Sequence, residues 1–487
     1  MLSTLDIILA LVFLGGVALA GNLLWKSKKA DDYFLGGRNL PWIAILASIV
    51  ATETSTLTFI GAPAISYAGN ISFIQLAAGY IIGRLVVAYL ILPGYFTGKH
   101  QTAYEVLSTS LGQGTRRLAS GIFLVTRTLA DGVRLYASAL VVSVVLGLDI
   151  LPSIVIIACV TLLYTLRGGL VAVVWTDLVQ LIVYLGGAVF ALFLLLDAIP
   201  GGIQEIFHTA TVSGKFDLLD FSIISSNPYT LAAGIAGGAF LSMASHGTDH
   251  LIVQRLMASR DLRAARKALI SSGIFVFFQF SLFLMIGLAL FVFYRDHALT
   301  SFNGKPDEVF PFFILNEVPS GARGLIVAAV LASAVSTLSS SLNSLSSSTC
   351  GDFVKPLLAA SRGKEWVKRW ENRGELLAGR SIAVAWCCVL LFVSFLAQNW
   401  GGVLETGLAI ASFTYGSLLG AFLLSILTNA GKVSGKGVPY GMLTGIAVMT
   451  VIFFLTELPW TWYVVVGTTV TCAAGWMISF AADRLGT

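Results

Sequence analysis

Apolar residues form a series of long runs along the chain, and short polar segments separate them. A run of about 20 apolar residues is long enough to cross a bilayer as an α-helix. The pattern therefore predicts an all-α polytopic membrane protein with about thirteen transmembrane helices. The predicted spans cover residues 4–24, 41–66, 71–96, 118–147, 151–166, 170–198, 230–252, 268–294, 322–348, 380–397, 402–428, 438–456 and 460–481.

Basic residues are concentrated in alternate loops between these spans. Because cytoplasmic loops are enriched in Lys and Arg, we expect the N-terminus outside and the C-terminus inside, in the inner (plasma) membrane. The predicted inside loops include the basic cluster at 26–29 and the loop that carries Arg255, Arg260 and Lys267. The predicted outside loops hold only Lys215, Arg295, Lys305 and Arg323.

Two predicted spans are interrupted by polar residues. The span at 41–66 contains the polar stretch 51–56, followed by Gly61 and Pro63, and the span at 230–252 contains the polar stretch 242–250. Polar groups and helix breakers in mid-span indicate unwound segments that line a cavity. These are the second and seventh spans, which predicts a core of five plus five helices related by an inverted repeat, each half opened by a broken helix.

This repeat divides the chain into three parts. We expect an N-terminal accessory span and inside loop at 1–40, a ten-helix transport core at 41–428, and two C-terminal accessory spans at 429–487. The segments 199–229 and 295–321 are expected to hold short outside helices. The segment 351–380 is expected to form a basic amphipathic helix on the anionic leaflet of the bilayer, or an ordinary solvated connector.

Hydroxyl side chains follow a helical spacing in the predicted span at 322–348 and place one polar stripe on it. Lipid offers hydroxyls no partner, so the stripe should face protein, water or an ion. Hydroxyl and carbonyl oxygens are hard ligands that suit Na⁺, whereas the alternative is that small residues allow close helix packing. The stripe consists of Ser333, Ser336, Thr337, Ser340, Ser344 and Ser347.

Charged residues inside predicted spans need a partner or an ion. Asp177 is interpreted either as a cation ligand or as a hydrogen-bonded carboxylate near the inner surface. Glu53 could bind a substrate amine, bind a proton, or pair with one of the intramembrane arginines Arg84, Arg127 and Arg134.

Two further groups of polar residues occur in the spans. Asp131 shares a helix face with Arg127 and Arg134 and could neutralise one of them locally. His246, Asp249 and His250 favour a polar gate at the inner end of their span, leading to Arg255, over a metal site.

Composition supports a membrane protein and excludes several function classes. Of the 487 residues, 56% are hydrophobic and 11% are charged, whereas about a quarter are charged in a typical soluble domain. The net charge of +5 is spread over loops, so no nucleic-acid partner is expected. Neither a catalytic triad nor a pair of catalytic carboxylates is recognisable, so the chain is not expected to be an enzyme.

Three stretches resemble the sodium/solute symporter family over nearly the whole chain. They are the run at 31–38 (DDYFLGGR), the run at 175–180 (WTDLVQ), and the Ser-rich run at 336–348 followed by Asp352. The resemblance implies a LeuT-like core of ten helices with three accessory helices, and Na⁺ as the coupling ion.

The resemblance also implies site residues. The principal sodium site would use backbone carbonyls of Ala51, Thr54 and Ser333 and the hydroxyls of Ser336 and Thr337. A second sodium site, found in some members, would use Asp177, Ser336, Ser339 and Ser340. The substrate pocket would be lined by Glu53, Ser55, Thr58, Phe73 and Arg134.

The chain is therefore interpreted as a sodium-coupled symporter that imports a small organic solute by alternating access, acting as a monomer in the lipid bilayer. Glu53 distinguishes it from the sugar carriers of the family and favours a solute with an amino or other cationic group. The alternative is a proton-coupled carrier on the same fold that uses Glu53 as its proton site. A channel is disfavoured because no filter-like loops are visible.

Overall fold

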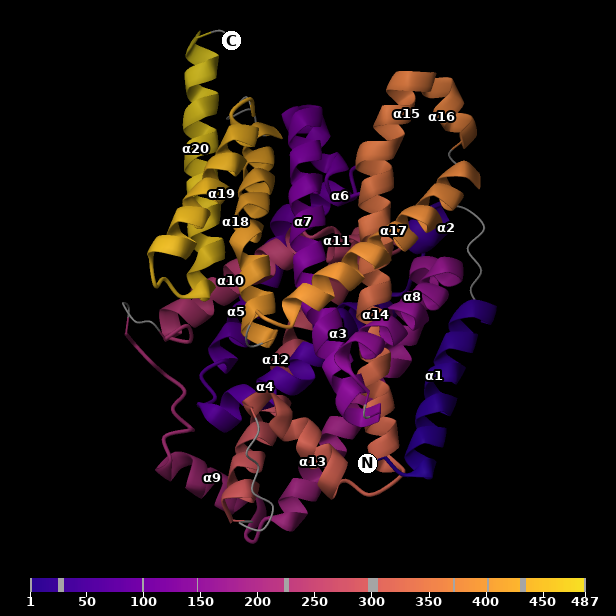
Figure 1. Ribbon diagram of the computed structural model, residues 1–487. Helices are drawn as coiled ribbons and strands as arrows, with labels where there is room; N and C mark the ends of the chain where they lie inside the picture. The colour runs from indigo at the N-terminus through magenta and orange to yellow at the C-terminus, as the bar shows by residue number, and fades with distance from the viewer. Residues whose placement is uncertain are drawn as a thin grey trace.

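The chain folds into an elongated bundle of helices (Figure 1). The computed structural model describes residues 2–24, 30–98, 100–146, 148–222, 227–296, 305–370, 373–400, 403–429 and 435–485. Within these ranges the secondary structure is helical, and an isolated β-bridge joins Leu40 and Ser259. The predicted all-α class is confirmed, and the basic cluster at 26–29 lies outside the described residues.

The first part of the bundle ends near residue 212. Its longest element, α8, contains two helical segments that meet at Gly169, whose φ of 59° suits glycine. These segments correspond to the predicted spans at 151–166 and 170–198. The elements are α1 (Thr4–Leu24), α2 (Ala30–Leu35), η1 (Gly36–Arg38), α3 (Trp42–Glu53), α4 (Thr56–Ala68), α5 (Ile74–Val86), η2 (Val87–Ile91), α6 (Leu92–Tyr95), α7 (Glu105–Leu146), α8 (Ile150–Ala198) and α9 (Gly202–Val212).

The second part of the bundle begins near residue 231. Its central helix, α14, continues through a π-helical turn into α15. The elements are α10 (Leu231–Gly247), α11 (His250–Met257), α12 (Leu262–Asp296), η4 (Pro306–Glu308), α13 (Val309–Glu317), α14 (Ala322–Ser348), η5 (Thr349–Val354), α15 (Lys355–Arg362), α16 (Lys364–Trp370), α17 (Arg373–Ala397), α18 (Val403–Asn429), α19 (Val438–Leu455), η6 (Trp460–Trp462) and α20 (Tyr463–Leu485).

Many of these helices match a bilayer in length and polarity. Among the described residues, eight helices are long and apolar enough to cross a membrane, or nine when the bent pair α3–α4 counts as one span. The four remaining predicted spans lie on α1, α7, the first segment of α8, and α10–α11. Large apolar side chains such as Phe193, Phe278 and Phe392 are exposed on the bundle surface, as lipid contact requires. The total of thirteen spans stays a prediction.

The expected break in the second span is present. Helices α3 and α4 meet at an angle of 60°. The break lies at Thr54 and Ser55, which have non-helical backbone angles. Gly61 and Pro63 lie within α4 and do not cause it, because the chain leaves the helix several residues earlier. The unwound segment is therefore shorter than the sequence suggested.

The seventh span is interrupted as well. Helix α10 ends at Gly247, Thr248 leaves the helical conformation, and Asp249 is the N-cap of α11, which begins at His250. The Asp249 side chain accepts a hydrogen bond from the backbone N–H of Leu251 at 2.8 Å, which caps the second segment. Both interrupted spans thus lie in the part of the chain assigned to the transport core, although the inverted repeat and the three-part division stay predictions.

Short helices occur at both ends of the bundle. Helices α9 and α13 lie at one end together with the N-terminus, and α15 and α16 lie at the other end with the C-terminus (Figure 1). Helices are therefore present, as α9 and α13, in the two segments where short helices were expected, and the described residues 351–370 and 373–380 are helical except at Gly363. Which end faces the cytosol stays a prediction.

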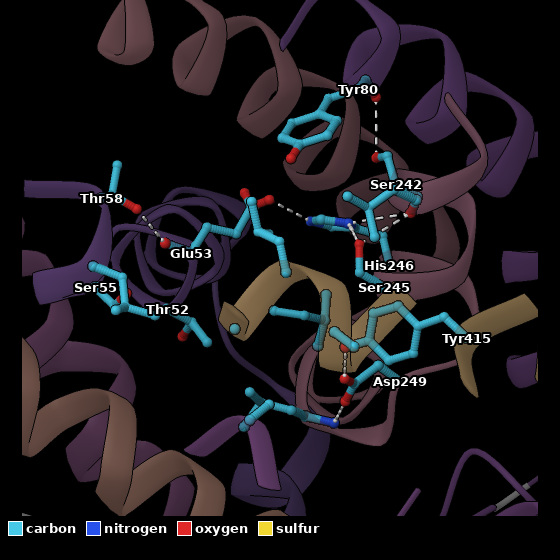
Figure 2. A pocket seen from close by; sticks show the side chains of 18 of the residues that line it. Thr52, Glu53, Ser55, Thr58, Tyr80, Ser242, Ser245, His246, Asp249 and Tyr415 are labelled. Carbon is cyan, nitrogen blue, oxygen red and sulfur yellow. Dashed lines mark hydrogen bonds and ion pairs between the residues drawn. The ribbon is translucent and has the colours of Figure 1, made fainter. Parts of the chain in front are cut away.

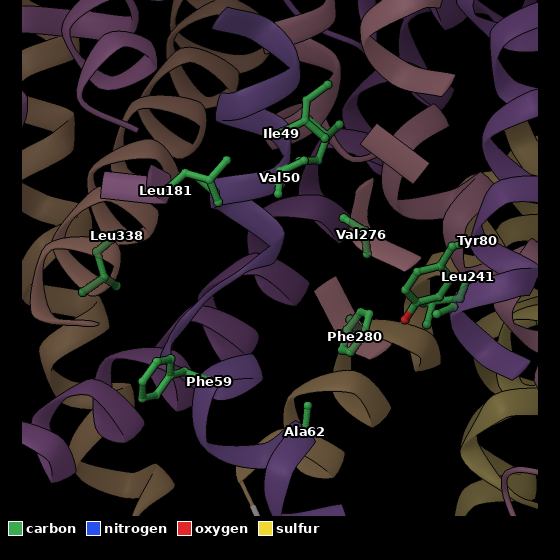
Figure 3. Close-up of a cluster of buried hydrophobic side chains, with 14 of the residues drawn as sticks. Ile49, Val50, Phe59, Ala62, Tyr80, Leu181, Leu241, Val276, Phe280 and Leu338 are labelled. Carbon is green, nitrogen blue, oxygen red and sulfur yellow. The ribbon is translucent and has the colours of Figure 1, made fainter. Parts of the chain in front are cut away.

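Aromatic packing fixes the second half of the broken span. Phe59 of α4 stacks on Phe310 with ring centroids 4.6 Å apart, and it meets Tyr184 and Phe283 edge-on at 5.1 and 5.6 Å. Figure 3 shows Phe59 within the buried cluster that also contains Ile49 and Val50 of α3 and Leu338 of α14. These contacts hold α4 at its angle to α3, so the break is a stable part of the fold.

Glycines let α5 approach α10 closely. A Cβ added at Gly83 would lie 2.2 Å from the carbonyl oxygen of Ala239, and a Cβ at Gly238 would lie 2.3 Å from that of Leu76. Small residues at such positions allow backbone contact between membrane helices.

We predict that Gly83→Ala destabilises the protein by about 1–3 kcal/mol, because the added methyl group forces α5 away from α10. Thermal unfolding in detergent, followed by tryptophan fluorescence, measures the effect. Gly186→Ala in α8 is the matched control, since a Cβ there meets nothing within 4 Å. Equal stability of the two variants would contradict the close packing of α5 on α10.

Candidate functional site

A cavity lies beside the break between α3 and α4. Its volume is about 110 Å³, many times the ~10–15 Å³ that one water requires. Its walls come from α3, α4, α5, α7, α10, α11, α12 and α18. All five residues expected in the substrate pocket line it, namely Glu53, Ser55, Thr58, Phe73 and Arg134. Their role as solute contacts stays a prediction.

Glu53 is held by two residues of other helices. Arg84 Nη2 donates to Glu53 Oε1 at 2.6 Å and to Oε2 at 2.5 Å. His246 Nε2 lies 3.3 Å from Oε1, as the dashed line in Figure 2 shows. The Arg84 side chain is fully buried, whereas 20% of the Glu53 side chain is exposed toward the cavity.

This pairing corresponds to one of the three alternatives for Glu53. Arg84 also donates to Ser272 Oγ at 2.6 Å, so the guanidinium is fixed between α3 and α12. A carboxylate that already accepts two hydrogen bonds from a guanidinium has its charge balanced. The ion pair therefore limits what a cationic group or a proton could gain at Glu53.

A second charged network closes another side of the cavity. Arg127 donates to both oxygens of Asp131, at 2.9 and 3.0 Å, as the spacing in the sequence suggested. Arg127 Nη1 also donates to Asp249 Oδ2 at 3.0 Å, and the Tyr415 hydroxyl donates to the same oxygen. Figure 2 shows Asp249 and Tyr415 together at this wall. The network links α7, α11 and α18.

Arg134 is less fully engaged than Arg84 and Arg127. Its Nη1 lies 3.7 Å from Asp131 Oδ1, which already accepts from Arg127. Within the described residues this Nη1 has no hydrogen-bond partner, and 22% of the side chain is exposed. Arg134 therefore lines the cavity with a positive group whose Nη1, itself buried, makes no hydrogen bond in the described part of the chain.

Residues of the expected principal sodium site meet across the break. Ser333 Oγ of α14 donates to the carbonyl oxygen of Thr54 at 2.8 Å. The Thr337 hydroxyl, one turn further along α14, is buried with no hydrogen-bond partner in the described part of the chain. A buried hydroxyl without a partner is costly unless it binds something that the structure does not contain. Ala51 lies one turn before the break, at the end of α3.

Residues of the expected second sodium site surround a different cation. The Ser336 hydroxyl donates to Asp177 Oδ1, and Arg255 Nη2 donates to the Ser340 hydroxyl. Ser339 instead donates to the carbonyl oxygen of Ser336 at 3.0 Å. Arg255 Nη2 lies 3.6 Å from Asp177 Oδ2, and both side chains are fully buried.

The assignment of Arg255 to an inside loop was wrong. Arg255 lies in α11, every residue of which is buried. The sequence held a signal for this, because apolar residues surround Arg255 in the stretch HLIVQRLM and no loop-forming residue interrupts them. The distribution of Lys and Arg between predicted loops placed Arg255 in a loop because it did not take the short helix α11 into account.

The polar residues of the seventh span do not act as one group. His246 faces Glu53 in the cavity, and Asp249 binds Arg127. His250 Nδ1 accepts a hydrogen bond from the backbone N–H of Ala103 at 3.2 Å. The three residues therefore make separate contacts, because the break at Thr248 turns successive side chains in different directions. The polar gate leading to Arg255 stays a prediction.

The cavity also contains two tyrosines that the sequence did not single out, beside Ser242 of the polar stretch 242–250. Tyr80 of α5, Ser242 of α10 and Tyr415 of α18 line it. Ser242 Oγ donates to the carbonyl oxygen of Tyr80 at 3.1 Å, which joins two of these walls (Figure 2). Tyrosines in apolar helices also fit ordinary helix packing, so only the folded arrangement identifies Tyr80 and Tyr415 as cavity residues.

Comparisons with known proteins agree with this architecture. A sequence model of the sodium:solute symporter family matches residues 33–445. A sodium/sialic acid symporter of Proteus mirabilis is 29% identical over 469 residues, which cover 95% of this chain and 92% of that protein. The human sodium/iodide cotransporter is 28% identical over 427 residues, and the match covers 86% of this chain but 64% of the human protein.

A solved structure is similar over its full length. It is a Na⁺-coupled sialic acid symporter in a substrate-bound, outward-open state, with a TM-score of 0.89 and 27% sequence identity. The match covers 98% of both chains. It supports a transporter fold of the LeuT type, as the resemblance in the sequence implied.

We predict that Glu53→Gln destabilises the protein by about 2–3 kcal/mol, because the variant leaves the buried Arg84 guanidinium without a counter-charge. The double variant Glu53→Gln/Arg84→Gln should recover part of this loss, since it removes both charges. Thermal unfolding of the single and double variants completes the cycle.

The same variant tests the other two interpretations of Glu53. A folded Glu53→Gln protein with a strongly raised KM would indicate an amine contact, and loss of pH dependence alone would indicate a proton site. Additive effects of the two substitutions would contradict the ion pair.

Proposed function

This chain belongs to the sodium:solute symporter family, and from that premise we propose that it imports a small organic solute together with Na⁺ by alternating access. One observation carries the proposal. At the break between α3 and α4, Glu53 faces the cavity while the carbonyl oxygen of the next residue, Thr54, contacts Ser333 of α14. A single unwound segment thus contributes to both the solute site and the sodium site.

Sodium is assigned to the oxygens between α3 and α14. The ligands are the carbonyls of Ala51, Thr54 and Ser333 and the hydroxyls of Ser336 and Thr337. The fit rests on the buried Thr337 hydroxyl, which lacks a hydrogen-bond partner among the described residues, and on the contact that brings Ser333 to Thr54. An ion here would supply the interaction that the hydroxyl lacks.

The charge of the solute is assigned from the cavity wall. Glu53 is balanced by Arg84, whereas Arg134 is 22% exposed and its buried Nη1 makes no hydrogen bond among the described residues. A guanidinium with free donors binds carboxylates well. We therefore assign Arg134 to an acidic group of the solute. Two relatives are named for sialic acid and iodide, which are both anions.

An amino or hydroxyl group of the solute would then lie toward Glu53. The expected contact between Glu53 and a cationic group of the solute is then a weaker interaction, because the Glu53 carboxylate already accepts hydrogen bonds from Arg84. Proton coupling through Glu53 is the competing function. It has less support, since both oxygens of Glu53 already accept hydrogen bonds from Arg84.

Transport follows from coupling the two sites. Sodium bound between α3 and α14 fixes the break that shapes the solute cavity, so each ligand stabilises the state that binds the other. The membrane potential contributes about 2.3 kcal/mol for each charge moved per 100 mV. We propose that the protein works as a monomer in the plasma membrane, with its N-terminus outside and its C-terminus inside.

We predict that Na⁺, but not K⁺ or choline, raises the thermal stability of the purified protein and drives uptake into proteoliposomes. Thr337→Val should weaken the apparent affinity for Na⁺ by about tenfold, which corresponds to about 1.4 kcal/mol. Ser347→Ala is the matched control, because its hydroxyl is also buried on α14 but ten residues further along. Full uptake driven by a proton gradient without Na⁺ would favour proton coupling instead.

We predict that Arg134→Gln weakens solute binding by about 10- to 100-fold, as expected when a charge-assisted hydrogen bond is lost. A thermal-shift screen of small carboxylic acids, each paired with its neutral amide, identifies the probe. The wild type should respond to the acid and not to the amide, and Arg134→Lys should recover part of the response. A preference for the amide in the wild type would reject an anionic solute.

A further inference from the structure

A second group of oxygens in the bundle resembles a cation site. It consists of the Asp177 carboxylate and three hydroxyls, from Ser48 of α3 and from Ser336 and Ser340 of α14, with Arg255 among them. We call these five residues the Asp177 cluster. All five are at most 2% exposed. Carboxylate and hydroxyl oxygens without nitrogen or sulfur ligands suit a hard cation.

Both oxygens of the Asp177 carboxylate are engaged. Ser48 Oγ donates to Oδ2 at 2.5 Å, and the Ser336 hydroxyl donates to Oδ1. The negative charge itself is balanced by Arg255, whose Nη2 lies 3.6 Å from Oδ2.

The Arg255 guanidinium is engaged at each of its three nitrogens. Nε donates to Ser48 Oγ at 2.8 Å, and Nη1 donates to the carbonyl oxygen of Leu251 at 2.8 Å. Nη2 donates to the Ser340 hydroxyl. The guanidinium therefore contacts Asp177 and Ser340, two of the four residues expected to hold a second sodium ion.

Charge decides what this cluster can accept. A second cation beside Asp177 would stand next to the Arg255 guanidinium in a dry part of the protein, where repulsion between like charges is strong. It would also compete with Arg255 for the Ser340 oxygen, one lone pair of which already accepts a hydrogen bond from the guanidinium. The cluster contrasts with Thr337, whose buried hydroxyl has no hydrogen-bond partner in the described residues.

We propose that the Arg255 guanidinium takes the place of a second sodium ion at Asp177, so that this protein couples one sodium ion to each solute. The inference rests on the proposed sodium-coupled function and specifies its stoichiometry. Arg255 is part of the chain and cannot be released with the solute, so it draws no energy from the sodium gradient. It instead ties α11 to α8 and α14 with a fixed positive charge.

The experiment counts sodium ions bound to the purified protein at equilibrium, using ²²Na⁺ and no solute. The wild type should bind about one ion, with a Hill coefficient of about one in Na⁺-dependent thermal stabilisation. Arg255→Met removes the charge but keeps the length of the side chain. It should bind about two ions with a Hill coefficient above one, because Asp177 and its hydroxyls become available.

Three further variants control this result. Arg260→Met makes the same substitution five residues away, at a side chain that is 74% exposed, and should keep the wild-type count. Arg255→Lys keeps the positive charge and should also bind the same number of sodium ions as the wild type. The double variant Arg255→Met/Asp177→Asn should return the count to one, because it removes the carboxylate that the second ion needs.

Two wild-type binding sites would overturn the inference while leaving sodium coupling intact. An unchanged count in a folded Arg255→Met protein would also overturn it. No sodium binding in the wild type would overturn both the inference and the proposed function. If Arg255→Met does not fold, Asp177→Asn provides the test. The number of sodium ions that this variant binds should stay at about one, because Asp177 is not a sodium ligand under the proposal.

Discussion

The need to neutralise buried charge constrains the whole arrangement of helices around the cavity. Isolated ions inside a bilayer-spanning bundle cost several kcal/mol each, so every such group must meet a partner. Three buried arginines do so across helices: Arg84 meets Glu53, Arg127 meets Asp249, and Arg255 meets Asp177. These pairs join α5 to α3, α7 to α11, and α11 to α8, and they fix the helices that form the walls of the site.

Both broken spans depend on this constraint. Glu53 is the last residue of α3, and Asp249 caps the start of α11, so each carboxylate lies where a helix is interrupted. An interruption exposes backbone groups that lipid cannot satisfy. Here Ser333 and the Asp249 side chain satisfy some of these groups, while the ion pairs balance the carboxylates. The breaks are therefore compatible with a membrane because other helices surround them.

Charge balance differs between Asp177 and the residues that we propose as sites for the solute and for sodium. At Asp177 the cation belongs to the chain, and at Glu53 the carboxylate is paired with only part of its surface facing the cavity. At Thr337 and Arg134, by contrast, hydrogen-bonding capacity is left over among the described residues. The proposed sodium and solute sites use these two groups, because the protein supplies no competing hydrogen-bond partner there.

The sequence by itself determined the helical class and a break within the polar stretch 51–56. Both follow from local rules, namely apolar runs and polar residues in mid-span. The five expected pocket residues came instead from the resemblance to a family, and they are part of the set that lines the cavity. The local pair of Arg127 and Asp131 was predictable from a local rule, because four residues along a helix bring side chains together.

Only the tertiary structure decided which arginine meets Glu53 and that Arg255 is buried against Asp177. Three intramembrane arginines were candidates for Glu53, and nothing in their sequence spacing favours Arg84 of α5. Partners on different helices are selected by crossing angle and by the closeness of approach that residues such as Gly83 permit. Periodicity assigns a residue to a face of its own helix, but it does not say which helix that face will meet.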